Sequence, residues 1–411
     1  MRKNKSQPSR SKFSVLRQLC NWIPPHLVPQ LARETGVEEK ARTFSPWSHV
    51  VAMLFAQLTR AIGLNDVCDG LGLHSGPLAA VRGATPPSRN TLSHANKNRD
   101  AALAQRLFWN VLEHLQNLKP GFAQGARFRL AHRFKRVIHV VDTTTIELVA
   151  NCLDWAKYRR RKAAAKCHLR LDLQSFLPRF AIIDTAQQHD ARRAAELCAG
   201  IRPGEIVIFD KAYLDLSHLY ELDQRDVFWV TRAKASLNFR VLKGMPQSKD
   251  DRIVQDELIE MTGFYSYQDY PQPMRRIVAW VEIEGQEVQM VFLTNNLAWS
   301  AGTIAKLYRC RWQIEVFFKQ IKQTLQLANF LGQSANAVRW QIWTALLLYV
   351  LLRFTAWVNG WAHSFTRLFT LLRSVLWQRF DLSELLRFYG TAGGNFRFLV
   401  QPQQAYLRPF L

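Results

Sequence analysis

The chain has 411 residues, of which 55 are Lys or Arg and 32 are Asp or Glu, so its formal net charge is +23. A positive charge of this size predicts a polyanionic partner. The content of 48% apolar and 12% aromatic residues excludes a wholly disordered chain. The length is sufficient for two or three domains with real cores.

Cysteines and apolar segments narrow the class of protein. The six cysteines are scattered, without a C-x-x-C pair or the spacing of a zinc site, which favours reduced thiols in the cytoplasm. The basic segment of residues 1–12 lacks the apolar region of a secretory signal, so we expect a disordered arm. The longest apolar run, residues 342–352, is shorter than the roughly 20 residues of a membrane span. We expect a cytoplasmic protein that binds no membrane and whose polyanionic partner is nucleic acid.

Helical spacing dominates residues 13–130, which we interpret as a helical DNA-binding domain. Within it, the polar segment of residues 88–99 follows a Gly- and Pro-rich stretch and starts with a capping serine. It is a candidate recognition helix of a helix-turn-helix motif, with possible base or phosphate contacts from Arg89, Asn90 and Lys97. A solvated helix face explains the same pattern, and the segment alone favours that simpler explanation.

Strand patterns begin in the next region, residues 131–225. A β-branched run ends in Asp142, and a second apolar run ends in Asp210. Further strands are expected over residues 166–173 and 179–184, and a helix over residues 190–200. This order of elements predicts a mixed α/β core in which two strand-terminal carboxylates lie at one edge of the sheet.

Four β-rich runs then occupy residues 226–300, which we interpret as an insertion into the core. The core resumes in residues 301–335 with one long helix, expected over residues 303–327, that carries Glu315. Aromatic-rich helices follow in residues 336–411, a helical C-terminal region.

The three carboxylates of Asp142, Asp210 and Glu315 suit hard divalent cations such as Mg²⁺, which prefer oxygen ligands. Two such cations roughly 3.5 to 4 Å apart can activate a nucleophile and stabilise a leaving oxygen at phosphorus. Each strand-terminal Asp taken alone is explained better as a turn former or a helix cap.

The residues on the helix around Glu315 favour the metal-site interpretation. On a regular helix, Tyr308, Arg311, Glu315 and Lys322 fall within an arc of roughly 60°. A carboxylate flanked by a phenol and two cations suits a metal ligand next to phosphate-binding groups. A solvent-exposed polar face remains the simpler alternative.

The same spacing matches the Y-x2-R-x3-E-x6-K signature, and the chain resembles bacterial insertion-sequence transposases of the IS-four family, a DDE group with a ribonuclease-H-like core. The match extends through VVDTTT at Asp142 and IVIFDKAYLDL at Asp210. The resemblance implies that Asp142, Asp210 and Glu315 are catalytic and hold two Mg²⁺ ions, with Mn²⁺ as a substitute. It also implies a nucleoid-associated bacterial protein that binds double-stranded DNA, both the inverted-repeat ends of the element and the target, as a homodimer in a synapse.

DNA contacts are implied for further residues by the same resemblance. Phosphates next to the cut would be bound by Tyr308, Arg311 and Lys322, with Tyr213 and Lys211 following the second Asp. The block FWVTRAK resembles a strand near transposon ends, which makes Arg232 and Lys234 candidate backbone contacts. The basic cluster of Lys157, Arg159, Arg160, Arg161, Lys162 and Lys166 would add electrostatic affinity, or is a solvated loop.

Two positions depart from the family pattern. Lys211 stands where many relatives have Arg, which keeps the charge but not bidentate phosphate contact. Met290 stands where hairpin-forming relatives have a Trp that holds a flipped base, so the hairpin step is left open.

Cleavage of element ends and strand transfer of the 3′-hydroxyl to target DNA are the implied reactions. Two alternatives stay open: a transposase-derived DNA-binding protein without catalysis, and a metal-dependent nuclease that cuts without joining. The sequence lacks the zinc-hydrolase and nucleotide-binding motifs. A glycosidase is disfavoured, because the cations around Glu315 would keep it ionised and unable to donate a proton.

Overall fold

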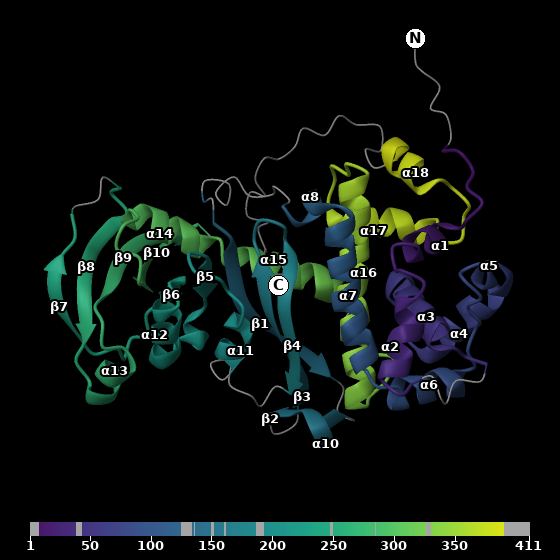
Figure 1. Ribbon diagram of the computed structural model, residues 1–411, viewed down its shortest axis with the longest axis horizontal. Helices are drawn as coiled ribbons and strands as arrows, with labels where there is room; N and C mark the ends of the chain where they lie inside the picture. The colour runs from purple at the N-terminus through teal and green to yellow at the C-terminus, as the bar shows by residue number, and fades with distance from the viewer. Residues whose placement is uncertain are drawn as a thin grey trace, which may run out of the picture.

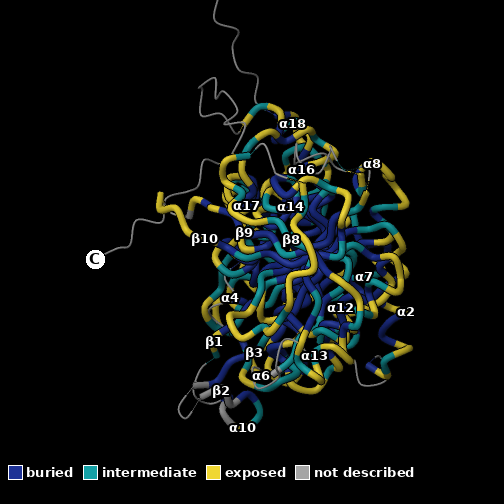
Figure 2. The backbone as a smooth tube through the Cα atoms, turned by 90° about the vertical axis from the view of Figure 1, so that its left-hand side faces the viewer, coloured by how far each residue is buried: buried dark blue, intermediate teal, exposed yellow. Residues whose placement is uncertain are grey.

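The computed structural model describes residues 8–37, 43–124, 134, 136–148, 152–159, 162–185, 193–246, 250–283, 285–325 and 330–389. A helical bundle and a long twisted sheet lie side by side along the longest axis of the molecule (Figure 1). Buried backbone fills the interior of the molecule, with exposed segments around the outside (Figure 2). Arg160 and Arg161 of the basic cluster, and residues 1–7 of the expected arm, lie outside the described residues.

The N-terminal part is helical, as its spacing predicts. Its helices are α1 (Val15–Cys20), α2 (Leu27–Glu34), α3 (Pro46–Thr59), α4 (Leu64–Leu73), α5 (Ser75–Ala79), α6 (Arg89–Asn98), α7 (Ala102–Leu118) and α8 (Pro120–Ala123). Ser45 caps α3 by accepting a hydrogen bond from the Ser48 amide at 3.0 Å, with Pro46 in the first turn. Helix α3 is buried along almost its whole length, because it runs through the centre of the bundle.

C-terminal helices complete this bundle. They are α16 (Ala335–Val358), α17 (Phe365–Ser374) and α18 (Leu382–Phe388). Helix α16 packs against α3, α6, α7 and α17. Among the described residues it is the one unbroken helix long and apolar enough to cross a bilayer, and 89% of its apolar window is buried inside the protein. Residues near the two ends of the described chain also meet, since the Ser11 amide donates to the Arg379 carbonyl at 2.7 Å.

The sheet contains all ten described strands. They are β1 (Ile138–Leu148), β2 (Lys157–Arg159), β3 (Lys162–Asp172), β4 (Leu177–Thr185), β5 (Ile206–Phe209), β6 (Phe228–Arg232), β7 (Phe239–Gly244), β8 (Ile253–Met261), β9 (Met274–Ile283) and β10 (Gln286–Thr294). In its core the order is β4-β3-β1-β5-β6, with β1, β5 and β6 parallel and β3 antiparallel to both of its long neighbours. This arrangement confirms the predicted mixed α/β fold with a ribonuclease-H-like core.

Shorter helices accompany the sheet. They are α10 (Leu153–Ala156), α11 (Ala194–Cys198), α12 (Leu216–Gln224), α13 (Phe264–Asp269), α14 (Ala301–Arg309) and α15 (Trp312–Lys319), with a 3₁₀ turn at Lys211–Tyr213 and a π-helical turn at Gln320–Thr324. Helices α14 and α15 follow β10 in the chain, and α15 contacts β1.

Two local expectations are wrong, and one strand was not expected. Strand β1 does not end at Asp142 but continues to Leu148, because its second half pairs with β3 as far as Ala163. Strand β6 belongs to the core sheet through parallel pairing with β5, and β10 pairs with β6, so β7 to β10 extend the core sheet instead of forming a separate one. Strand β7 is exposed along most of its length and was not expected.

The long helix expected over residues 303–327 is also interrupted. Helix α14 ends at Arg309 and α15 begins at Trp312. Between them the amides of Cys310, Arg311 and Gln313 each bond to the carbonyl three residues earlier, at 2.9, 2.9 and 3.0 Å. Bonds of this spacing tighten the chain into a 3₁₀-type turn, which changes the direction of the side chains that follow.

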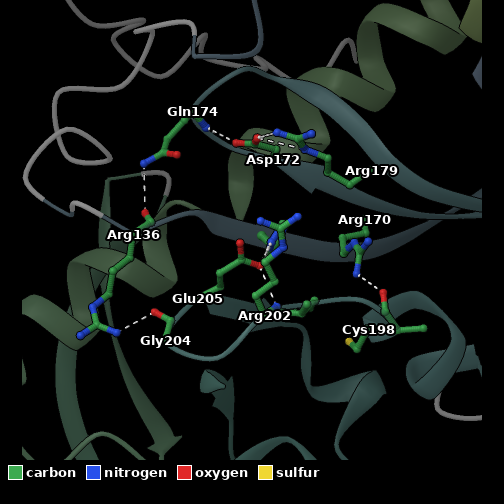
Figure 3. A network of polar contacts seen from close by, with 12 residues as sticks. Arg136, Arg170, Asp172, Gln174, Arg179, Cys198, Arg202, Gly204 and Glu205 are labelled. Carbon is green, nitrogen blue, oxygen red and sulfur yellow. Dashed lines mark hydrogen bonds and ion pairs between the residues drawn. The ribbon is translucent and has the colours of Figure 1, made fainter. Parts of the chain in front are cut away.

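A polar network holds the amino-terminal end of the core strands (Figure 3). Arg136 donates to the Gly204 carbonyl at 2.7 Å, and Gln174 donates to the Arg136 carbonyl at 3.0 Å. Asp172 accepts from the Gln174 amide at 2.8 Å and from Arg179 at 2.6 Å. Since these bonds join the segments that enter β1, β4 and β5, they help to set the register of β1 against β5.

Candidate active site

Two of the three predicted carboxylates are brought together by the parallel pairing of β1 with β5. In this register Val141 lies opposite Phe209, so Asp142 and Asp210 follow at the same level of the sheet. The Asp142 side chain is 16% exposed. Its Oδ1 accepts a 2.8 Å hydrogen bond from the Thr143 amide. Two carboxylates are thus held next to each other on neighbouring strands.

Arg311 links the third carboxylate to this pair. The residue lies in the turn between α14 and α15, where it donates to Asp142 Oδ2 at 2.8 Å and to Glu315 Oε1 at 2.9 Å. The Arg311 side chain is 13% exposed, whereas Glu315 is 54% exposed. One guanidinium therefore neutralises both carboxylates. It bonds to the largely buried Asp142 on one side and to the solvent-exposed Glu315 on the other.

Tyr308 approaches the second carboxylate from α14. Its ring is buried and packs on Phe292 of β10, with 5.0 Å between ring centroids. The Tyr308 hydroxyl donates to Asp210 Oδ1 at 3.3 Å. Burial raises the pKa of this phenol above its ordinary value, so it stays a proton donor at neutral pH.

Lys322 reaches the site from the π-helical turn. Its ammonium donates to the Thr145 carbonyl of β1 at 2.8 Å, three residues beyond Asp142. Burial lowers the pKa of Lys322 below its ordinary value. All four residues of the spacing motif thus reach the β1–β5 edge, although the helix that carries them is broken between Tyr308 and Glu315.

Burial, with a smaller contribution from neighbouring carboxylates, raises the pKa of Asp142. This pKa rises from 3.8 to about 6, and Asp210 and Glu315 are the carboxylates that contribute, while Arg311 and the Thr143 amide oppose the rise. A carboxylate in this environment gains from any added positive charge. The donor set, three carboxylates, fits a hard divalent cation. Within the described part of the chain no three acidic, His or Cys side chains lie close enough together to form a metal-binding cluster. At this site Arg311 lies between Asp142 and Glu315 and bonds to both.

Tyr213 faces the protein interior. Its side chain is 1% exposed, and its hydroxyl contacts the hydroxyl of Thr143 and, at 3.3 Å, Nδ1 of His168. Thr143 and His168 are cross-strand partners in the β1–β3 pairing and are also joined at 2.7 Å. The sequence pattern did not single out Thr143 or His168. The DTTT run was the one available signal, since the alternation of β3 does not show that His168 lies opposite Thr143. In this arrangement Tyr213 supports β1 and offers no surface to DNA.

The other candidate cations of the core, Lys211, Arg232 and Lys234, differ in how far their side chains are exposed. Lys211 is exposed just after Asp210. Arg232 is half-buried on β6 and lies near enough to Tyr308 to influence its pKa. Lys234 is exposed and donates to the Leu214 carbonyl at 2.9 Å. Met290 is only 5% exposed in β10, so its side chain presents no surface on which a flipped base could stack.

The N-terminal candidates are on the surface of α6. Helix α6 buries Leu92 and Ala95 against its neighbours α4 and α16. The remaining face is exposed and carries Arg89, Asn90 and Lys97. This face belongs to the helical bundle and not to the β1–β5 edge (Figure 1).

Comparison with known families and proteins decides the family. The profile described as "Transposase DDE domain" matches residues 133–351 and so spans β1, β5 and the segment with Glu315. The chain belongs to the DDE transposase family. It is a DNA-transposition enzyme of a group that cleaves and joins DNA strands and depends on divalent metal ions. A second profile, a domain of unknown function named DUF4372, matches residues 11–81 of the transposase.

Individual relatives agree with this assignment. A putative transposase of Sinorhizobium fredii is 29% identical over 306 residues, which cover 73% of this chain and 81% of the relative. A probable transposase for insertion sequence element IS5377 of Geobacillus stearothermophilus is 30% identical over 226 residues, 55% of this chain and 58% of the relative. Among solved structures, a piggyBac transposase synaptic complex with hairpin DNA aligns over 93% of this chain and 84% of that chain, with a TM-score of 0.46 and 8% identity.

Proposed function

We propose that this transposase cleaves the inverted-repeat ends of an insertion sequence and joins the released 3′-hydroxyl to target DNA at the β1–β5 edge, with Asp142, Asp210 and Glu315 as catalytic residues. The observation that carries the proposal is the meeting of Asp142 and Asp210 on adjacent parallel strands, with Arg311 bonded to both Asp142 and Glu315. Three segments far apart in sequence thereby supply one acidic site.

The three carboxylates would hold two Mg²⁺ ions, with Mn²⁺ as a substitute. When bound, such ions activate the attacking oxygen and stabilise the leaving oxygen at phosphorus. The raised pKa of Asp142, about 6, supports this assignment, because a cation at the site would stabilise the ionised carboxylate that burial penalises.

Phosphates next to the cut would be bound by the phenol of Tyr308 and the cations of Arg311 and Lys322. The Arg311 guanidinium, which bonds to Asp142 and Glu315, would supply positive charge for a phosphate at this edge of the sheet. The Tyr308 hydroxyl orients Asp210 through the bond it donates.

More distant DNA contacts follow the exposed cations. Lys211, Lys234 and the half-buried Arg232 would bind the DNA backbone near the cut, and the exposed face of α6 would contribute affinity away from it through Arg89, Asn90 and Lys97. Two copies of the chain would hold two element ends together in a synapse, in the bacterial nucleoid.

The test uses purified full-length protein and a linear DNA that carries the ends of the element, with Mg²⁺ or Mn²⁺, followed on a denaturing gel. Wild type should cleave at the ends and form joined products, whereas Glu315→Gln should bind the ends and cleave at least a hundredfold more slowly. Glu113→Gln, which changes an exposed glutamate on α7, is the matched control and should behave as wild type.

Each alternative has its own result. Cleavage without joined products at any target concentration would identify a nuclease that does not transfer strands. End binding without cleavage in wild type would identify a DNA-binding derivative that has lost catalysis. Equal cleavage by wild type and Glu315→Gln would remove Glu315 from the active site.

A further inference from the structure

Arg60 occupies an unusual backbone conformation at the end of α3. Its φ of 58° and ψ of 45° lie in the left-handed region, where it caps the helix with its amide bonded to the Ala56 carbonyl. Glycine is the residue that adopts this conformation without steric penalty, and it is the usual choice at this position of a helix end. An arginine at this position therefore points to a role for its side chain.

The Arg60 side chain leaves the N-terminal helices and reaches the catalytic segment. Its Nε donates to the Thr324 carbonyl at 3.2 Å, and its terminal nitrogen donates to the Gln323 carbonyl at 3.3 Å. The guanidinium also lies 5.2 Å from the centroid of the Phe369 ring of α17. One side chain thus joins α3, α17 and the π-helical turn.

Those two carbonyls close the turn that carries Lys322. The last carbonyls of any helix lack partners within it, so they need donors from elsewhere, and a cation there also complements the helix dipole. The Thr324 hydroxyl contacts the Thr366 hydroxyl of α17 at 3.3 Å. On its other side the turn contacts β1 through Lys322, whose ammonium bonds to the Thr145 carbonyl at 2.8 Å.

We propose that Arg60 is a positioning residue for Lys322, and that through it the N-terminal helical bundle holds the phosphate-binding side of the active site in place. This inference rests on the proposed role of Lys322 at the phosphate next to the cut. In this role Arg60 makes the N-terminal bundle contribute to catalysis, in addition to the DNA binding proposed for α6. Loss of the Arg60 bonds would free the end of the turn and allow Lys322 to leave its place on β1.

The decisive variant is Arg60→Gly. Glycine suits the left-handed backbone at residue 60, so helix α3 and the bundle should keep their stability while the two bonds to the turn are lost. Arg60→Lys keeps a cationic donor group but not the two separate donor nitrogens, so it should retain part of the activity that Arg60→Gly loses. Arg82→Gly is the matched control, because Arg82 also has a positive φ, of 53°, and donates to a carbonyl, that of Ile23 at 2.9 Å, but within the bundle.

Single-turnover cleavage at saturating DNA is the first measurement. Arg60→Gly should cleave about tenfold more slowly with unchanged DNA affinity and melting temperature, Arg60→Lys should be intermediate, and Arg82→Gly should cleave at the wild-type rate. Arg60→Gly should cause little further loss when added to Lys322→Met, because Arg60 contributes to the rate through Lys322. A wild-type rate for Arg60→Gly, or losses that multiply fully in the double variant, would overturn the proposal.

Hydrogen exchange of the amides in residues 320–325 is the second measurement, and it does not depend on catalysis. Exchange there should be faster in Arg60→Gly than in wild type and unchanged in Arg82→Gly. Equal protection in wild type and Arg60→Gly would refute the positioning role. If wild type itself fails to cleave, the proposed function is wrong, and hydrogen exchange still decides whether Arg60 holds the turn.

Discussion

Asp142→Asn should make the protein more stable in the absence of divalent ions, although it removes a proposed catalytic group. Burial and the neighbouring Asp210 raise the pKa of Asp142 from 3.8 to about 6 even with Arg311 bonded to it. The folded protein therefore binds this proton more tightly than the unfolded chain does. Ionisation of Asp142 costs stability as pH rises from 3.8 toward 6, and the cost is constant above that.

The magnitude follows from the two pKa values. At 1.36 kcal/mol per pKa unit, the difference between 3.8 and about 6 corresponds to about 3 kcal/mol at pH 8, and the same relation gives about 1.5 kcal/mol at pH 5. The Asn variant cannot ionise, so it should be more stable than wild type by about these amounts. The 16% exposure of the side chain is low enough for most of this penalty to persist in water.

The assay is urea denaturation of wild type and Asp142→Asn in EDTA at pH 5 and pH 8. Asp69→Asn, an exposed carboxylate on α4, is the control and should change the free energy of unfolding by less than about 0.5 kcal/mol. Added Mg²⁺ should stabilise wild type and not Asp142→Asn. A variant less stable than wild type, or a difference that is the same at both pH values, would refute the reasoning.

Three other changes test separate parts of the structure. Tyr308→Phe removes the hydroxyl bonded to Asp210 and should slow single-turnover cleavage about tenfold; an unchanged rate would show that this bond has no role in the reaction. Arg275→Met leaves the buried Asp256 carboxylate without its 2.6 Å partner and should cost about 3 to 5 kcal/mol in urea denaturation, a claim that a loss below about 1 kcal/mol would contradict. Lys97→Ala should weaken DNA binding equally for all sequences and reduce the slope of log affinity against log salt by about one, and an unchanged slope would exclude a phosphate contact at this position of α6.

The family and the broad architecture were predictable because they depend on local pattern and spacing. Strand-like runs before Asp142 and Asp210, and the fixed offsets from Tyr308 to Lys322, need no knowledge of distant contacts. The family profile confirms the transposase assignment. The helical character of the N-terminal part was visible for the same reason, since capping by Ser45 and Pro46 is a local signal.

Local pattern failed where a distant partner decided the outcome. Strand β1 continues past Asp142 because β3 pairs with it, and the pattern of β1 does not reveal its partner. The helix before Glu315 breaks into a tight turn, although its apolar spacing is continuous. Tyr213 matched a position associated with DNA contact, yet its hydroxyl bonds to Thr143 and His168 inside the core.

The sequence by itself determined the composition of the site: three carboxylates, a phenol and two cations on elements of the right type. Only the tertiary structure decided how they are arranged, since the register of β1 on β5 places Asp142 beside Asp210, and the turn before α15 places Arg311 between Asp142 and Glu315. The link from Arg60 to the turn that carries Lys322 joins residues that are 264 and 263 positions apart in the sequence. Contacts of this kind form when separate elements pack, which is why no spacing along the chain could have shown them.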